Sequence, residues 1–161
     1  MYQPQFLKKK VDVSKITWID VFDKIESDRQ EKTLRIALPK ENPDWNLMTL
    51  KEIILHHGAM NTIACHGDYI PQNMISLLDH MKKHYGMKTF HQYTSFNNKS
   101  NTLGYHNDTV DVIIVPIIGE IGYNVDGLGE IKMEPGDMLC IPKYTFHEPI
   151  LYEARATLSF S

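Results

Sequence analysis

The chain has 161 residues, of which 42% are hydrophobic and 23% charged, and its net charge is −3 at pH 7. These values are typical of one ordinary globular domain, and the absence of a basic excess argues against a nucleic-acid-binding surface. No apolar run approaches the roughly 20 residues of a membrane span, and no hydrophobic signal region opens the chain. Cys65 and Cys140 lie in apolar contexts, which favours reduced thiols in the core. We therefore expect a cytoplasmic protein in which residues 1–161 form a single domain, with neither nucleic acid nor membrane as a partner.

Two helices are predicted in the N-terminal half, residues 1–86. Apolar residues at helical spacing predict the first helix over about 15–27, with Ser14 as its N-cap. A second helix is predicted over about 71–85, and Gly86 follows it at the position of a C-cap glycine. These helices predict an N-terminal α/β layer.

Strands are predicted around and after these helices. A short strand over 34–38 ends at Pro39, whereas residues 50–55 fit a helical turn and a strand equally well. From residue 87 onward the period of the hydrophobic pattern changes from 3.6 to 2. The strands predicted there are 88–96, the stretch entering His106, 111–118, 120–125, 129–133, 138–142, 147–152 and 154–161. Short strands separated by Asp-Gly and Pro-Gly turns are typical of an antiparallel barrel or jelly roll. Pro116 lies inside the apolar run 112–118, which predicts a bulge or an edge at that point.

The residues with the clearest chemistry are His106 and Asp108, followed much later by His147. Two imidazoles and one carboxylate can occupy one face of an octahedral metal and leave the other positions open, the arrangement of non-haem Fe(II) oxygen chemistry. In a strand, residues i and i+2 point the same way, so His106 and Asp108 can chelate one ion. His147 would then come from another strand. The same ligand types also suit Mn, Ni and Zn.

The order of these motifs resembles a known family. Residues 105–108, the apolar strand 111–119, the Pro-Gly-Asp segment 135–142 and His147 resemble the cupin superfamily, and within it the JmjC-like, cupin-type Fe(II)/2-oxoglutarate-dependent oxygenases. The resemblance covers about residues 90–160 and implies a mainly β fold, a double-stranded β-helix. It also implies that His106, Asp108 and His147 bind Fe(II), and that 2-oxoglutarate is the cosubstrate of a dioxygenase or hydroxylase.

The sequence departs from the family at the cosubstrate. Many cupin-type hydroxylases hold 2-oxoglutarate with a Lys or Arg a short way after the metal carboxylate, but residues 119–123 contain no basic residue. The segment Arg155-Ala156-Thr157 resembles the Arg-x-Ser/Thr pair of other 2-oxoglutarate oxygenases. By strand period Arg155, Thr157 and Ser159 share a face, and a guanidinium can bind a carboxylate in a bidentate manner. The alternative is that Arg155 is an exposed strand residue.

Tyr93 is a further candidate, because the family often supplies a hydroxyl to 2-oxoglutarate from the strand before the metal strand. It belongs to a polar stripe that faces either a pocket or solvent and consists of Thr89, His91, Tyr93 and Ser95.

Other histidines form weaker patterns. His66 and Asp68 repeat the His-x-Asp spacing, but a helix follows them and Asp68 fits its start. His80 and His84 are four residues apart on a helix and have no evident third ligand.

Two other functional classes use the same triad. One is a cupin enzyme of another type, such as an isomerase or a 2-oxoglutarate-independent dioxygenase, and the other is a non-enzymatic ligand-binding cupin. We expect a small-molecule or peptide substrate, and exposed barrel edges would allow a homodimer.

Overall fold

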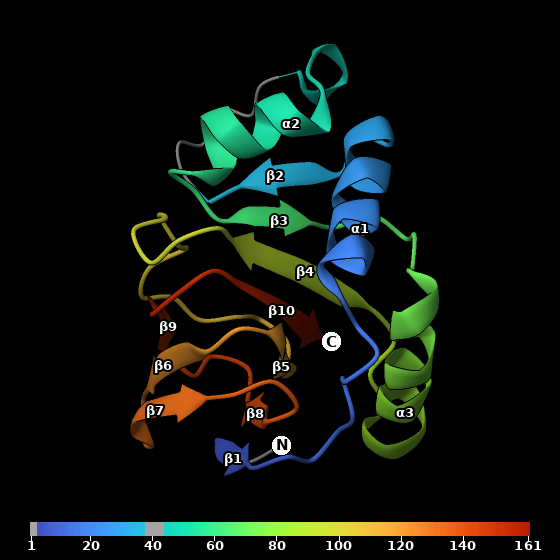
Figure 1. Ribbon diagram of the computed structural model, residues 1–161. Coiled ribbons are helices and arrows are strands. Elements are labelled where there is room, and N and C mark those ends of the chain that lie inside the picture. The colour runs from blue at the N-terminus through green and yellow to red at the C-terminus, as the bar shows by residue number, and fades with distance from the viewer. Residues whose placement is uncertain (1–2, 38–43) are drawn as a thin grey trace.

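The structure is a computed structural model that describes residues 3–37 and 44–161 (Figure 1). Its strands form two antiparallel sheets, one of seven strands in the order β1-β8-β5-β10-β4-β3-β2 and one of three strands in the order β7-β6-β9. The strands are β1 (Gln5–Leu7), β2 (Leu34–Ile36), β3 (Ile63–Cys65), β4 (Phe90–Ser95), β5 (Val112–Ile118), β6 (Ile121–Val125), β7 (Gly129–Met133), β8 (Met138–Ile141), β9 (His147–Leu151) and β10 (Arg155–Phe160). The helices are α1 (Trp18–Gln30), α2 (Leu50–Ile53), which continues as the π-helical turn η2 (Ile54–Gly58), α3 (Ile75–Tyr85), and the 3-10 turns η1 (Trp45–Leu47) and η3 (Gln72–Met74).

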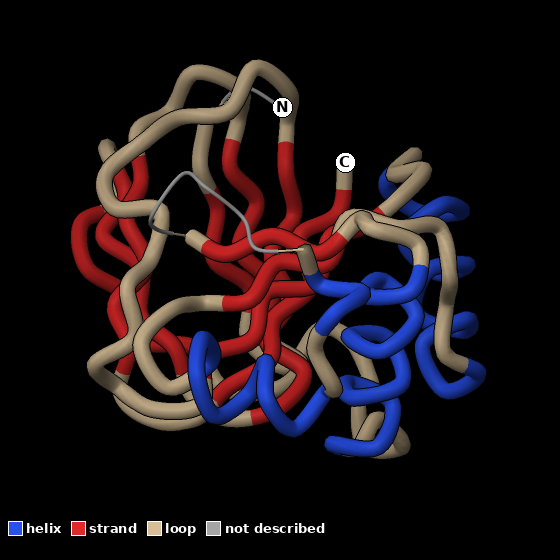
Figure 2. The backbone as a smooth tube through the Cα atoms, turned by 90° about the horizontal axis from the view of Figure 1, so that it is seen from above, coloured by secondary structure: helices blue, strands red, loops and turns tan. Residues whose placement is uncertain are grey.

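The large sheet has two different faces. The helices gather on one side of the strands (Figure 2), where the main core joins residues of α1 and α3 to inward residues of β2, β3, β5 and β10. On the opposite face, a smaller apolar cluster joins β5 and β8 to β6 and β7 of the small sheet. The small sheet thus covers only the β5–β8 part of this face with apolar contacts.

Both predicted helices are present, but their starts are shifted: α1 begins at Trp18 rather than about residue 15, and α3 begins at Ile75, after η3, rather than about residue 71. α1 begins after Thr17, whose backbone N–H and hydroxyl both donate to the Asp20 carboxylate, at 2.8 and 3.1 Å. Ser14, the predicted N-cap, instead donates its backbone N–H to Asp12 Oδ1 at 2.9 Å in a local turn. A carboxylate at the third helical position binds the free N–H group at the helix start, so the pair Thr17–Asp20 sets the boundary. The prediction of Ser14 was wrong.

The C-cap prediction is confirmed, because Gly86 has φ +72° and ends α3. Residues 50–55, which fitted either structure, are helical: the Glu52 carboxylate accepts from the Thr49 N–H at 2.7 Å and closes a capping box. The end of the strand predicted over 34–38, including Pro39, lies outside the described residues.

The predicted strands after residue 87 are present within about two residues, apart from the stretch entering His106, which forms a single β-bridge. Pro116 lies at a bulge: Thr157 pairs with Pro116 and Ala156 with Ile118, so one residue of β5 has no partner in this pairing. A proline cannot donate to a sheet ladder, and the irregularity accommodates it inside an otherwise central strand. The prediction did not include the three-residue strands β1 and β3.

Both cysteines are buried free thiols, as expected. In the part of the chain that the structure describes, no helix has the length and apolar character needed to cross a membrane.

Candidate metal centre

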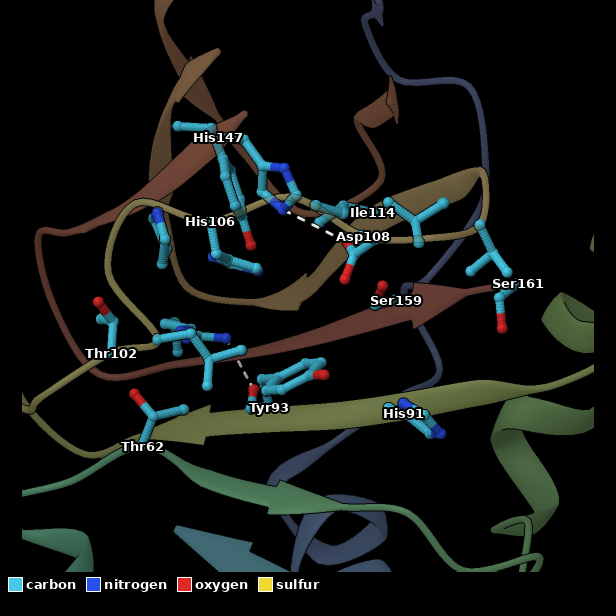
Figure 3. A pocket seen from close by; sticks show the side chains of 16 residues that line it. Thr62, His91, Tyr93, Thr102, His106, Asp108, Ile114, His147, Ser159 and Ser161 are labelled. Carbon is cyan, nitrogen blue, oxygen red and sulfur yellow. Dashed lines mark hydrogen bonds and ion pairs between the residues drawn. The ribbon is translucent and has the colours of Figure 1, made fainter. Parts of the chain in front are cut away.

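The structure brings His106, Asp108 and His147 together. Each offers one ligand atom, and these atoms lie within 4.8 Å of one another. His147 Nε2 is 3.6 Å from Asp108 Oδ2, and the two histidine rings have their centroids 4.4 Å apart. Figure 3 shows the three side chains on one side of a cavity, with Tyr93 and His91 on the other. Within the described residues, this is the one group of three or more His, Cys, Asp or Glu side chains that could hold an ion.

The backbone holds the two imidazoles side by side. His106 and His147 form an isolated antiparallel bridge, in which the His106 N–H donates to the His147 carbonyl at 3.0 Å and the His147 N–H returns the bond at 2.8 Å. The carbonyl of Asp108 accepts from the Tyr144 N–H at 2.7 Å. These three bonds join the two segments that provide the ligands. They hold the ligand side chains together without a β-strand through residues 106–108. The predicted strand geometry of the His-x-Asp motif was wrong in that respect.

Hydrogen bonds also determine which ring nitrogen of each histidine is free. His106 Nδ1 lies 2.8 Å from the Gly104 carbonyl, and His147 Nδ1 lies 3.0 Å from the Thr145 carbonyl. A carbonyl can only accept, so each Nδ1 has the hydrogen and each Nε2 keeps its lone pair for a metal. Burial lowers the pKa of His147, although the Thr145 carbonyl acts in the opposite direction. A neutral ring is the form that binds metal.

The donor set therefore fits a divalent cation. Two imidazoles and a carboxylate converge from one side, and the other side is a cavity of about 150 Å³. This combination suits Fe(II) with open coordination positions, and also other first-row metals.

The floor of the cavity is the polar part of the large sheet. β10 pairs with β4 so that Thr157 lies opposite Tyr93 and Ser159 opposite His91. Apolar side chains from β5 and from the loop before it form much of the wall. The lining residues are Thr62, His91, Tyr93, Thr102, Leu103, His106, Asp108, Val110, Val112, Ile114, Tyr123, His147, Pro149, Arg155, Ser159 and Ser161.

Arg155 is the buried cation of this cavity. It is 2% exposed, so the alternative of an exposed strand residue was wrong. Its Nη1 donates to the Tyr93 carbonyl at 2.9 Å, whereas its Nε has no partner. No carboxylate among the described residues forms an ion pair with it, and burial lowers its pKa. A buried charge without a counterion is unfavourable, so the cavity is suited to an anionic ligand.

The other two predicted cosubstrate residues are adjacent. Tyr93 lines the cavity, and burial raises the pKa of its phenol to about 12, so the hydroxyl keeps its proton. Thr157 is fully buried and its hydroxyl has no hydrogen-bond partner within the described residues. It lies between Tyr93 and Pro116 in the sheet.

Tyr123 and Thr62 are two of the lining residues that the sequence interpretation missed. Tyr123 is buried in β6, with its ring centroid 6.3 Å from that of His147. Tyr123 alternates with Ile121 and Val125, and this alternation predicts that all three side chains lie on the same, buried face of the strand. The sequence interpretation considered residues 119–123 only as a possible source of a basic residue. Thr62 was missed because β3 was not predicted.

The weaker histidine patterns remain outside the site. The His66 ring lies against the His91 ring, with centroids 4.2 Å apart, and Asp68 is exposed. His80 and His84 are neighbours on α3, with ring centroids 4.5 Å apart.

Solved structures of other proteins have an architecture similar to that of this chain. The structure of YcfD, a ribosomal oxygenase from Escherichia coli, in complex with cobalt and succinic acid aligns over 100% of this chain with a TM-score of 0.71 and 17% identity. The complex of YcfD with cobalt and 2-oxoglutarate aligns over 99% of the chain with a TM-score of 0.71 and 18% identity. This chain has the cupin fold of a double-stranded β-helix. The predicted fold class is thereby confirmed.

The chain spans about half the length of the YcfD structures, 49% and 48%. No protein-family model and no curated protein matches the sequence.

Proposed function

We propose that this protein is an oxygenase that requires Fe(II) and 2-oxoglutarate. The triad alone would also suit other metal-binding cupins. The observation that supports 2-oxoglutarate is Arg155, a buried guanidinium that lines the same cavity as the triad and has no carboxylate partner among the described residues. The YcfD structures, which have the same fold, contain cobalt with succinic acid or 2-oxoglutarate.

Each residue has a defined task in this proposal. His106, Asp108 and His147 hold the metal, and the carbonyls of Gly104 and Thr145 keep the two rings in the binding tautomer. Arg155 binds the distal carboxylate of 2-oxoglutarate, with the protonated Tyr93 and Thr157 hydroxyls as further donors. When bound, Fe(II) and 2-oxoglutarate together supply the activation of O2, with oxidative decarboxylation to succinate. The apolar wall, which includes Val112 and Ile114, excludes water from the reacting groups.

The size of the cavity limits what the substrate can place inside it. Ligand pockets for drug-sized molecules are about 300–1,000 Å³, whereas this cavity has about 150 Å³. The cavity is therefore suited to a ligand smaller than a drug-sized molecule, such as 2-oxoglutarate. We propose that only the reacting group of a small-molecule or peptide substrate enters the metal cavity, while the rest lies outside it.

Succinate release tests the proposal. Protein loaded anaerobically with Fe(II) is mixed with 2-oxoglutarate and O2, and succinate is measured without added substrate, where slow uncoupled turnover is expected. Asp108→Ala should abolish the signal, whereas Asp79→Ala, at an exposed carboxylate on α3, should leave it unchanged. A metal-bound protein that releases no succinate under these conditions would support a cupin of another class.

A further inference from the structure

A second cavity lies beside the metal cavity. It has a volume of about 90 Å³, and it shares Thr62, Tyr93 and Leu103 with the first cavity. Its remaining lining comes from β2, β3 and the residues next to them. The two cavities therefore adjoin along these three residues, and we call the line from the metal ligands past Tyr93 to Arg35 the path.

The floor of this path is a row of side chains that crosses the large sheet. Tyr93 of β4 lies opposite Ala64 of β3, and Ala64 lies opposite Arg35 of β2. Directly paired residues point to the same face of a sheet, and neighbouring strands are about 4.8 Å apart. The backbone of Arg35 is therefore two strand spacings, roughly 10 Å, from the backbone of Tyr93 along the floor. The small methyl side chain of Ala64 leaves the depression between them.

Arg35 is fixed in place without neutralisation of its charge. Its side chain is exposed, and its Nη1 donates to the carbonyls of Lys32 and Leu34, at 3.0 and 2.8 Å. In the part of the chain that the structure describes, no carboxylate forms an ion pair with it. The bonds to two carbonyls hold one side of the guanidinium and leave its other donors available to a ligand.

Within the described residues, Arg35 gives the β2 end of the path a positive charge, whereas the metal end has both the Asp108 carboxylate and the buried Arg155. None of the residues that line the second cavity is acidic, and Arg35 is the permanently charged one. The His66 ring lies beside it on the same floor, and Asp108 belongs to the metal end. Between the ends, Leu103 and Ala64 provide apolar surface. A ligand that matches this pattern has an anion at one end and an apolar segment after it.

We infer that Arg35 binds an anionic group of the substrate, a carboxylate, sulfate or phosphate, and that the apolar second cavity beside it holds the segment that connects this group to the carbon that is oxidised. This inference rests on the proposed function, because it takes the triad as the place of oxidation. It adds a substrate class: an acid whose charge is separated from its reacting carbon by a segment that extends past Tyr93 and Ala64, two strand spacings or about 10 Å of floor. The acid can belong to a small molecule or to the side chain of a peptide.

The test uses defined probes. Linear alkanoates from hexanoate to dodecanoate, with the primary amides of equal length as neutral controls, are titrated against protein that contains Mn(II) and 2-oxoglutarate. Binding of the acids but not of the amides is expected, with affinity that depends on chain length. Because Mn(II) relaxes nearby protons, the methyl end of a bound acid should relax faster than the methylene beside its carboxylate. Short peptides with one Glu, compared with the same peptides with Gln, distinguish a peptide acid from a small-molecule acid.

Two variants and a control locate the binding. R35Q should weaken the affinity for the acid by about tenfold or more, because it removes a charge-assisted bond. A64L should also weaken it by filling the floor, whereas K83Q, which removes an exposed charge on α3, should not change it. Equal affinity in R35Q and wild type, faster relaxation at the carboxylate end, or no binding of any acid would overturn the inference. If Mn(II) and 2-oxoglutarate fail to bind, that result counts against the proposed function and not against this inference. Saturation-transfer measurements on metal-free protein then still compare the affinity of R35Q for the acid with that of wild type.

Discussion

Replacement of Arg155 by methionine should have opposite effects on stability and on ligand binding. In the folded protein, the guanidinium is 2% exposed and has one hydrogen bond, to the Tyr93 carbonyl. Loss of that bond should cost about 1 kcal/mol of unfolding free energy. Removal of a buried charge in favour of an apolar side chain of similar size often stabilises by about 1–4 kcal/mol. We therefore expect Arg155→Met to be more stable than wild type by about 0–3 kcal/mol.

The affinity for 2-oxoglutarate should fall in the same variant. Charge-assisted hydrogen bonds contribute about 1.5–3 kcal/mol, which corresponds to a loss of roughly 10- to 100-fold in affinity. Arg155→Lys is the matched control: it keeps the charge but not the planar fork, and should give an intermediate affinity.

Two measurements on each variant test whether Arg155 binds 2-oxoglutarate. Urea unfolding of the metal-free protein gives the stability, and titration of 2-oxoglutarate into anaerobic Fe(II) protein gives the affinity. If Arg155→Met lost 2 kcal/mol or more and still bound 2-oxoglutarate as wild type does, Arg155 would be a structural residue and the proposed cosubstrate site would be wrong.

Metal, pH and backbone variants test other parts of the structure. At a metal concentration one hundred times its Kd, Mn(II) should raise the unfolding free energy of wild type by about 2.7 kcal/mol. Asp108→Ala should lose this gain in urea titrations, and an unchanged gain would place the ion elsewhere. Burial, and after it the neighbouring His91, lowers the pKa of His66 from 6.5 to about 4. The unfolded state therefore binds more protons between these values, and stability should fall as the pH drops from 6.5 to 4. Because the ring is exposed on one side, we expect a loss of only about 1 kcal/mol, and His66→Gln should show a flatter dependence of the urea midpoint on pH. At Gly119, which has φ +70°, an added Cβ would overlap the Ala154 carbonyl, whereas Gly129 has φ +77° and open space around it. Gly119→Ala should therefore lower the melting temperature clearly more than Gly129→Ala, for which strain of about 1–2 kcal/mol is expected; equal losses would contradict the close approach.

The strands after residue 87 could be predicted because their signal is local. The apolar runs of β5 and β8, the alternation in other strands and the turns between them depend on neighbours in the sequence. Gly86 was predictable for the same reason, since a left-handed C-cap favours glycine at one position. β1 and β3 have only three residues each, and partners distant in sequence stabilise them. A three-residue run contains too little alternation to distinguish a strand from a loop.

The site was only partly predictable. The spacing of His106, Asp108 and His147 indicated a metal centre, but the strand expected at His106 is a single bridge to His147. The burial of Arg155 depends on how β10 lies between β4 and β5, which its own sequence does not determine.

The role inferred for Arg35 was beyond sequence reasoning. Its place on the floor depends on the register of β2 with β3 and of β3 with β4. A shift of one residue in either pairing would turn its side chain to the helical face.

The absorption spectrum of the anaerobic protein tests the central claim most directly. With Fe(II) and 2-oxoglutarate both present, bidentate binding of the 2-oxo acid to the metal should produce a visible metal-to-ligand charge-transfer band. We expect this band in wild type, its absence in Asp108→Ala, and a higher 2-oxoglutarate concentration for half saturation in Arg155→Met. A wild-type protein that binds Fe(II) and develops no band at saturating 2-oxoglutarate would contradict the account.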